Sequence, residues 1–540
     1  MKLRFRWGAV AVALLMLAGG CSSEDDGGIT ITTGIPIDVA PKTTAPGTTE
    51  VVDTTGAPEF TPSLSEWSGG MATLTVPLDH ADPGGATIEV PLARAEATDP
   101  SRRIGVLLVN PGGPGYPASP LATFADQVFT EELRARFDII GLDPRGTFPD
   151  TAVNCFNNLE ELWTTVDYSP DAPGEQEELV AAIEEWVDDC ERRHPDLLEH
   201  VSTMDTVDDM AMLVEALGEE QVSYLGFSYG TALGAAFVTE YPELVRAAVL
   251  DAAYLPTDDP FDSLLDSFVA MEDLLVRVFD ECDSDPECPI QGGAQAAFTE
   301  LAARADAEPI SDNRLLPTVN EQGFAAIIRF SDVAYGGSAR PLLEAVAAAN
   351  RGDYFRLQTL LANSIALLEA GGSALAISCM DSPYREMPPL PADALQRLEA
   401  ASPTMSAVFP TPEGFDPFSI PDECMLWPAG PDPLPDPLSG EGAGPVLVVG
   451  ATEDPVTPLA SARKLADGLV NGTFLIVESE VHGSYQIDVP IRSEARACAT
   501  EFMDDFLIGL QVPPDGTVCA KPEPEPEEGE SEEGESTDEG

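Results

Sequence analysis

Apolar runs typical of strands alternate with helical patterns along most of the chain. Eight runs are predicted to form strands, and the later ones are continuously apolar, as expected for parallel strands covered on both faces. They span residues 72–78, 88–93, 105–110, 137–142, 222–225, 247–250, 446–450 and 473–478. Apolar residues from Val207 to Leu217 recur at helical spacing, and Gly218 is expected to end that helix. This alternation predicts an α/β fold with a mostly parallel, doubly wound sheet.

The strand pattern is interrupted between residues 259 and 430, where helical patterns dominate. Helix-like stretches lie at residues 261–279, 294–307, 339–349 and 364–370. An insertion between two strands on the C-terminal side of the sheet would lie over the edge where ligands bind. We therefore expect a core in two parts, residues 63–258 and 435–519, with a mainly helical cap inserted at residues 259–434.

The first twenty residues have the pattern of an export signal. Three basic residues precede an apolar stretch at 8–17 that is too short to span a membrane. The sequence Leu-Ala-Gly-Gly-Cys that follows resembles a bacterial lipobox and ends at Cys21. We expect residues 1–20 to be a lipoprotein signal peptide, and Cys21 to anchor the protein to lipid on the extracytoplasmic face. Ordinary cleavage and secretion is the alternative.

The composition is strongly acidic. Asp and Glu number 94 against 27 Lys and Arg, which gives a formal net charge of −67. Such a charge repels nucleic acid and bare anionic lipid surfaces, so we expect neither as a partner. Residues 21–62, rich in Thr, Pro, Gly and Asp, are typical of a flexible tether, and residues 520–540 of a disordered acidic tail.

The nine cysteines also indicate export. If Cys21 carries lipid, eight cysteines are left, an even number that can form disulfides in an oxidising compartment. We expect each to pair with its neighbour in the chain. The expected pairs are Cys155 with Cys190, Cys282 with Cys288, Cys379 with Cys424, and Cys498 with Cys519. Zinc is the rival interpretation, but the chain lacks Cys-x-x-Cys and a His beside a Cys cluster, so we expect no metal and no cofactor.

Ser228 is the candidate nucleophile. It lies in Gly226-Phe-Ser-Tyr-Gly230, directly after the apolar run 222–225 and before a helix-like stretch at 231–240. That context predicts a sharp turn that presents one hydroxyl at the end of a sheet. The two glycines are expected because strand and helix cross closely there and the serine backbone is strained.

His482 is the candidate base. A serine hydroxyl needs a base within hydrogen-bond reach, and in Gly-x-Ser-x-Gly enzymes the acid and then the histidine follow the serine in the chain. Of the four histidines, only His482 lies downstream, a few residues after the last predicted strand. His194 and His200 lie in a charged stretch typical of a surface, and His80 is interpreted as structural.

Asp454 is the candidate acid that orients the imidazole, because it follows the strand at 446–450. Glu453 is adjacent and is expected to point elsewhere. Asp251, at the end of the strand 247–250, is the other candidate. Thr457 is interpreted either as a hydrogen-bond partner within the acid loop or as a helix cap.

A glycine-rich loop, Pro111-Gly-Gly-Pro-Gly115, follows the strand at 105–110. Glycines allow backbone N–H groups to approach a substrate oxygen, so this loop is a candidate oxyanion hole. The expected donors are the amide of Gly113 and the amide of Tyr229, the residue after the nucleophile.

These motifs together resemble the tripeptidyl aminopeptidase branch of the α/β-hydrolases, relatives of proline iminopeptidase and of secreted actinobacterial serine peptidases. They also resemble a mycobacterial cell-envelope lipoprotein described as carboxylesterase and protease. The motifs are Val-Asn-Pro-Gly-Gly-Pro-Gly at 109–115, Asp-Pro-Arg-Gly at 143–146, Gly-Phe-Ser-Tyr-Gly-Thr at 226–231, Thr-Glu-Asp-Pro-Val-Thr-Pro at 452–458 and Val-His-Gly at 481–483. Proline iminopeptidase has His-Gly-Gly-Pro-Gly where this chain has Asn-Pro-Gly-Gly-Pro-Gly.

The resemblance implies an α/β-hydrolase fold with an inserted cap, a triad of Ser228, Asp454 and His482, and cleavage of short peptides from a free N-terminus. An exopeptidase of this kind must pair the substrate ammonium with an anion, and Asp381 and Glu386 of the cap are candidates. A carboxylesterase with the same triad, and a binding lipoprotein without catalysis, are the alternatives.

Overall fold

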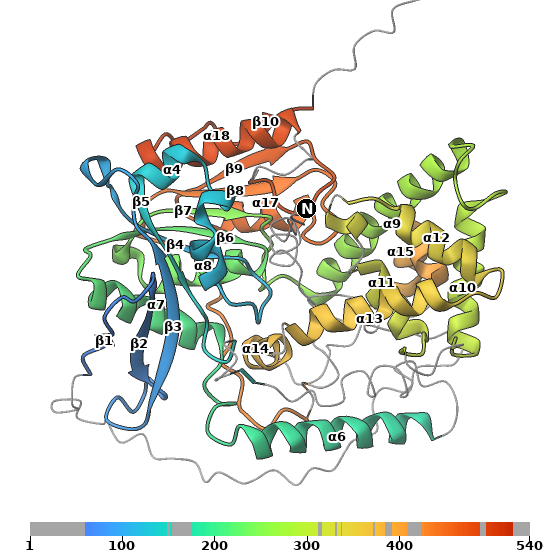
Figure 1. Ribbon diagram of the computed structural model, residues 1–540, viewed down its shortest axis with the longest axis horizontal. Coiled ribbons are helices and arrows are strands. Elements are labelled where there is room, and N and C mark those ends of the chain that lie inside the picture. The colour runs from blue at the N-terminus through green and yellow to red at the C-terminus, as the bar shows by residue number, and fades with distance from the viewer. Residues whose placement is uncertain are drawn as a thin grey trace, which may run out of the picture.

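One mixed sheet forms the centre of the molecule in the computed structural model (Figure 1). Among the described residues, its strands lie in the order β1-β2-β3-β5-β4-β6-β7-β8-β9-β10. The pairings β1–β2, β2–β3 and β3–β5 are antiparallel, and all the others are parallel. The strands are β1 Ser63–Leu64, β2 Met71–Pro77, β3 Thr87–Ala95, β4 Gly105–Asn110, β5 Phe137–Leu142, β6 Val222–Phe227, β7 Val245–Asp251, β8 Val446–Ala451, β9 Gly472–Val477 and β10 Thr517–Cys519.

The structure describes residues 60–147, 152–153, 174–311, 316–329, 332–335, 337–370, 373–383, 391, 393–408, 424, 426–485 and 493–521. Cys21, the expected signal peptide, most of the expected tether and the acidic tail beyond Lys521 lie outside the described residues. Within them, no helix is both long enough and apolar enough to cross a membrane.

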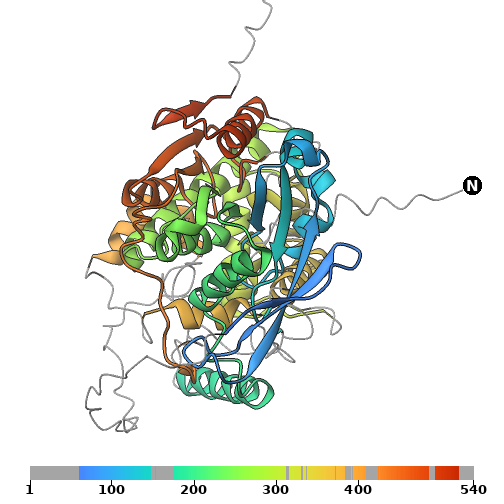
Figure 2. The same ribbon diagram turned by 90° about the vertical axis from the view of Figure 1, so that its left-hand side faces the viewer.

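Helices cover both faces of the sheet (Figures 1 and 2). Adjacent residues of β4 point to opposite faces: Leu108 belongs to the core shared with α7, α8 and α17, and Leu107 to the core shared with α2, α3, α4 and α18. The prediction of a doubly wound, mostly parallel sheet is therefore confirmed. The helices are α2 Ser119–Thr123, α3 Ala125–Val128, α4 Glu131–Arg136, α7 Thr203–Leu217, α8 Tyr229–Glu240, α17 Leu459–Gly468 and α18 Glu494–Gly509.

Helix α7 has clear signals at both ends. Ser202 and Asp205 form a capping box in which each side chain bonds the other's backbone N–H. At the C-terminal end Gly218 has a φ of 69°, the left-handed conformation that glycine adopts without strain. The expected end of this helix is thus confirmed.

Between β7 and β8 lie helices, most of which gather beside the sheet on the right in Figure 1, while α14 lies nearer its middle. They share one apolar core with α6 (Glu175–Arg193) and with Val456, which follows β8. Helix α14 contacts α7 of the sheet layer. The inserted elements are α9 Pro260–Ser284, α10 Ala294–Ala307, α11 Glu321–Arg329, η4 Asp332–Tyr335, α12 Arg340–Ala349, α13 Phe355–Ala370, α14 Ala374–Asp381, α15 Ala394–Ala401 and α16 Pro403–Val408.

Three of the four expected disulfides are present: Cys282–Cys288, Cys379–Cys424 and Cys498–Cys519. Cys190 is also disulfide-bonded, but Cys155, its expected partner, lies outside the described residues. That last pair stays a prediction.

Candidate active site

Ser228 lies at the turn between β6 and α8 in a strained conformation. Its φ is 54° and its ψ is −125°, a region that non-glycine residues rarely adopt. The turn is held on both sides: the Ser228 N–H donates to the carbonyl of Asp251 at 3.0 Å, and the Ser228 carbonyl accepts from the N–H of Thr231 at 2.8 Å. Ser228 remains partly exposed, so the fold presents its hydroxyl rather than burying it.

The two glycines around Ser228 are required by space. A Cβ atom on Gly226 would lie 2.2 Å from the carbonyl oxygen of Gly230. A Cβ on Gly230 would lie 2.8 Å from Oδ1 of Asn110, at the end of β4. The close crossing of strand and helix that the sequence predicts is therefore confirmed.

The glycine-rich loop after β4 lies against the same turn. Gly112 donates its N–H to Oδ1 of Asn110 at 2.8 Å, and Gly112 and Gly113 have φ values of 96° and 128°. A Cβ on Gly112 would lie 3.0 Å from Cβ of Ser228 and 3.1 Å from the backbone nitrogen of Tyr229. The loop that carries Gly113 thus lies beside both the candidate nucleophile and the amide that follows it.

Asp454 and His482 are joined directly. The Asp454 Oδ2 and Oδ1 atoms lie 2.9 Å and 3.1 Å from Nδ1 of His482, and both residues are buried. Asp454 also accepts from the N–H groups of Val456 and Thr457, at 2.8 Å and 2.9 Å. Burial alone would raise the pKa of the Asp454 carboxyl, but the charge of His482 and these hydrogen bonds outweigh it and hold the pKa below its usual value.

Thr457 belongs to the acid loop. Its hydroxyl donates to Oδ2 of Asp454 at 3.0 Å and lies 3.2 Å from Nδ1 of His482. The N-cap of the following helix is Pro458, so the structure favours the acid-loop interpretation of Thr457 over the helix-cap interpretation.

The alternative acid, Asp251, holds backbone instead of the imidazole. Its carboxylate accepts from the N–H of Ser484 at 2.9 Å and from the N–H of Tyr485 at 2.7 Å, just beyond His482. Its own carbonyl accepts from Ser228. Asp251 therefore ties the turn of the nucleophile to the loop of the histidine, and burial raises its pKa.

Glu453 points away from the imidazole, as expected. Its carboxylate forms a short ion pair with Arg277 of α9 and lies 3.5 Å from Nζ of Lys521. Glu480, two residues before His482, pairs with the same two cations, at 3.6 Å from Arg277 and 2.5 Å from Lys521. We call these four residues the charge cluster; it joins the acid loop, the histidine loop and helix α9.

The topology explains why residues distant in sequence lie at the same edge of the sheet. β6, β7, β8 and β9 are consecutive, parallel neighbours in the sheet. Their carboxyl ends therefore lie at one edge, where α/β folds place ligands. Ser228 follows β6, Asp251 ends β7, Asp454 follows β8 and His482 follows β9.

The insertion also reaches this edge. The ring of Tyr335, in η4, meets the imidazole of His482 edge-on at 5.7 Å between centroids. The phenol of Tyr335 is also near Tyr116, the residue directly after the glycine-rich loop. The pKa of Tyr116 is raised mainly by burial and further by Tyr335. No pattern in the sequence identifies Tyr335, because its position depends on how the inserted helices pack.

The remaining residues considered in the sequence are Asp381, Glu386, His194 and His200. Asp381 is at the end of α14, and its two carboxylate oxygens accept from the N–H and the hydroxyl of Thr203, at 2.7 Å and 2.6 Å. Glu386 lies outside the described residues. His194 and His200 are half-buried rather than fully exposed.

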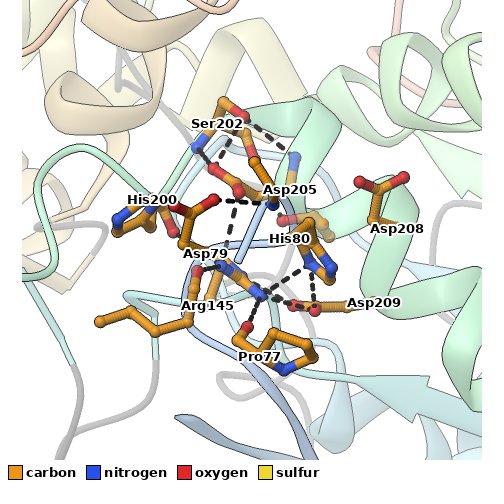
Figure 3. A network of polar contacts seen from close by, with 12 residues as sticks. Pro77, Asp79, His80, Arg145, His200, Ser202, Asp205, Asp208 and Asp209 are labelled. Carbon is orange, nitrogen blue, oxygen red and sulfur yellow. Dashed lines mark hydrogen bonds and ion pairs between the residues drawn. The ribbon is translucent and has the colours of Figure 1, made fainter. Parts of the chain in front are cut away.

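His80 belongs to a buried polar network (Figure 3). Arg145, from the Asp-Pro-Arg-Gly motif, donates to both carboxylate oxygens of Asp209 at 2.8 Å and 2.6 Å. Nε2 of His80 lies 3.0 Å from the same carboxylate, and Arg145 also donates to the carbonyls of Pro77 and Leu78. The network fastens β2 to α7, which is the structural task expected of His80.

Two family models match the chain. The model described as "alpha/beta hydrolase fold" covers residues 105–285, and the model described as "TAP-like protein" covers residues 414–519. Together with the sheet order and the turn at Ser228, they decide the family. The chain belongs to the α/β-hydrolases.

Similar proteins of known name indicate which branch of the α/β-hydrolases this chain resembles. The chain is 29% identical to the serine protease Hip1 of Mycobacterium tuberculosis over 83% of this chain and 86% of that protein. It is 29% identical to carboxylesterase B of the same organism over 90% and 96%, and 26% identical to a tripeptidyl aminopeptidase of Streptomyces lividans over 83% of each. Among solved structures, a proline iminopeptidase of Mycobacterium smegmatis matches at 17% identity over 81% of this chain and 100% of that one, with a TM-score of 0.31. The chain is an enzyme of the hydrolase class.

Proposed function

We propose that this enzyme is a serine hydrolase that releases short peptides from the N-terminus of its substrates. The observation that carries the proposal is the Asp454 carboxylate, which holds Nδ1 of His482 at the sheet edge where Ser228 is presented. An imidazole fixed through Nδ1 directs its other nitrogen outward as a base, which is the arrangement that activates a serine hydroxyl.

In the proposed reaction, the hydroxyl of Ser228 attacks the scissile carbonyl while His482 takes its proton. Asp454 stabilises the imidazolium that forms, and its lowered pKa keeps it ionised for that purpose. The amides of Gly113 and Tyr229 stabilise the oxyanion of the tetrahedral intermediate. His482 then protonates the leaving amine, and water, deprotonated by His482, releases the acyl group.

Turnover of a peptide series tests this proposal. A tripeptide p-nitroanilide with a free N-terminus should be hydrolysed by the wild type, and Ser228→Ala should lose at least about 10³-fold in kcat. The matched control is Ser338→Ala, an exposed serine of the insertion outside the acid and histidine loops, which should keep wild-type activity. Hydrolysis that survives Ser228→Ala would contradict the proposed nucleophile, and a wild type inert toward amides and esters would favour the binding lipoprotein.

Esterase activity is the second candidate, favoured by the match to carboxylesterase B along 90% of this chain. The same residues serve either reaction, so the discriminating measurement is the same tripeptide with and without an N-acetyl group. An aminopeptidase should lose most kcat/KM on acetylation, because the carboxylate that pairs with the substrate ammonium would lose its partner. Equal rates would contradict the aminopeptidase proposal and favour an esterase.

The proposed location is the extracytoplasmic side of a membrane, with lipid on Cys21. The support is the lipobox-like sequence that ends at Cys21 and the three disulfides, which need an oxidising compartment. Expression of the full chain in a bacterial host supplied with a radiolabelled fatty acid should label the wild type. Cys21→Ser should lose the label and release the protein from the membrane fraction; equal labelling would contradict the anchor.

A further inference from the structure

The side chain of Tyr229 is anchored far from its own amide. Its hydroxyl forms a short hydrogen bond with Oγ1 of Thr203, at the first residue of α7, and both residues are buried. Oγ1 of Thr203 lies 2.6 Å from Oδ2 of Asp381, and the N–H of Thr203 donates to Oδ1 at 2.7 Å. A continuous hydrogen-bond chain therefore runs from α8 through α7 to α14 of the insertion.

We propose that Thr203 and Asp381 are positioning residues of the oxyanion hole, acting through the hydroxyl of Tyr229. The inference rests on the proposed function, in which the amide of Tyr229 stabilises the oxyanion. The peptide between Ser228 and Tyr229 is held at its carbonyl, which accepts from the N–H and the hydroxyl of Thr231 at 2.8 Å and 2.6 Å. The bond from the Tyr229 hydroxyl holds the residue at a second point, and together these contacts fix the direction of its amide.

Thr203 is itself held firmly enough to act as an anchor. It follows Ser202, whose capping box with Asp205 fixes the start of α7. Oγ of Ser202 also lies 2.6 Å from Oδ2 of Asp432, and Asp205 lies 3.4 Å from Nη1 of Arg145 (Figure 3 shows this end of the network). The start of α7 is thus fastened to the segment after the insertion and to the Arg145 network.

The direction of the hydrogen bonds depends on the proton at Asp381. When the carboxylate is ionised, Thr203 donates to Asp381 and the hydroxyl of Tyr229 donates to Thr203. When Asp381 is protonated it can donate to Oγ1 of Thr203, which then donates to Tyr229, so the order reverses. The ionised chain is the stronger anchor because it ends on a charge.

The surroundings of Asp381 bring its pKa into the physiological pH range. Its pKa is raised to about 7: burial is the main cause, the bonds from Thr203 oppose it, and the carboxylates of Asp432 and Asp205 add to it. The phenols of Tyr229 and Tyr254 also face it. An ordinary surface carboxylate would stay ionised throughout this range, and its chain would not respond to pH.

This assignment differs from binding of a substrate ammonium by Asp381. Both carboxylate oxygens already accept hydrogen bonds from Thr203, and the third member of the chain is the residue that follows the nucleophile. An ammonium subsite would change the affinity for substrates with a free N-terminus, whereas a positioning role changes the reactivity of Ser228 toward any acylating or phosphonylating reagent.

The test is the second-order rate of fluorophosphonate labelling of the full chain between pH 5.5 and 8.5. The reagent needs the nucleophile and the oxyanion hole but carries no ammonium. The pH profile of the wild type should include the ionisation of Asp381. Asp381→Asn, whose amide can still bond Thr203 through both atoms, should fold and lack that ionisation. Thr203→Val should lack it too and label about five-fold more slowly at pH 8, the worth of one hydrogen bond.

Two controls separate positioning from loss of structure. Thr203→Ser keeps the hydroxyl and should restore the wild-type profile. Thr206→Val removes another buried hydroxyl of α7, one that donates to the carbonyl of Ser202 at 3.4 Å, and should leave the profile unchanged. Thermal unfolding of each variant checks that the fold is intact.

The outcomes are distinct. Wild-type labelling with unchanged profiles in Asp381→Asn and Thr203→Val would overturn the inference and leave the proposed function standing. An Asp381→Asn variant that labels normally but has a raised KM only for peptides with a free N-terminus would overturn it in favour of an ammonium subsite. A wild type that is not labelled at all would overturn the proposed function and this inference with it.

Discussion

Asp251 and Asp454 are buried carboxylates at the ends of neighbouring strands, and their hydrogen bonds assign them different tasks. Asp454 holds the imidazole of His482, whereas Asp251 holds the backbone beyond it. The sequence predicts Asp454 as the acid and leaves Asp251 as an alternative. It cannot separate the two by pattern, because each follows an apolar strand, and only the register of the histidine loop decides which carboxylate meets Nδ1.

Substitution of each carboxylate should separate these tasks. Asp454→Asn should lower kcat by about 10³- to 10⁴-fold with little change in fold, because the imidazole loses its correct tautomer. Asp251→Asn turns one acceptor into a donor facing two N–H groups, so it should lower the free energy of unfolding by about 1–3 kcal/mol and reduce kcat less. Asp143→Asn is the control at another strand end. Equal kcat losses at both positions would contradict the assignment.

The raised pKa of Asp381 has a consequence for stability at the same scale. A carboxyl with a pKa of about 7 in the folded chain and an ordinary value when unfolded binds its proton more tightly in the folded state. Its contribution to stability is therefore complete below the unfolded pKa and is lost as pH rises toward 7. Chemical unfolding from pH 4.5 to 7.5 should show a steeper decline for wild type than for Asp381→Asn, and parallel curves would contradict the raised pKa.

At the scale of elements, local patterns predict what is continuous in the chain. Strands β4 and β5 have the predicted bounds because each is a mostly apolar run with turn residues after it. Strands β1 and β10 were not predicted, because two or three partly exposed residues carry no strand pattern. The contact between Thr203 and Tyr229 could not be predicted from the sequence either, because it depends on how α7 packs on α8 and not on any motif.

The charge cluster links an inserted helix to the acid loop and the histidine loop, and its effect should depend on salt. Arg277→Met removes the cation shared by Glu453 and Glu480, and should lower kcat/KM by about two- to five-fold, in line with partly exposed ion pairs worth up to about 1 kcal/mol. In 1 M NaCl the wild type should approach the variant, because screening weakens the same pairs. The control is Arg340→Met, an exposed ion pair elsewhere in the insertion. A salt-independent difference, or an equal effect of Arg340→Met, would contradict the link.

At the scale of the whole molecule, the sheet is completed at one edge by a covalently fastened strand. β10 pairs parallel with β9 and carries Cys519, which is bonded to Cys498 of α18 across 21 residues. The disulfide pairing was predictable from order along the chain, but the strand it secures was not.

Loss of this disulfide should cost more than loss of a local one. The double variant Cys498→Ser and Cys519→Ser opens a loop of 21 residues, and should lower the free energy of unfolding by about 3 kcal/mol. The matched control, Cys282→Ser with Cys288→Ser, opens a loop of only 6 residues and should cost less. Denaturant unfolding of both double variants measures the difference, and the reverse order would contradict the loop-length argument.

The central claim is that Ser228, Asp454 and His482 form one catalytic unit at the carboxyl edge of the sheet. Peptide mass spectrometry after fluorophosphonate treatment tests it most directly, because it reads the modified residue itself. We predict a single adduct on Ser228 in the wild type, formed at least about 10³-fold more slowly in His482→Ala, whose base is missing. An adduct on another residue, or one that forms on Ser228 equally fast without His482, would contradict the claim.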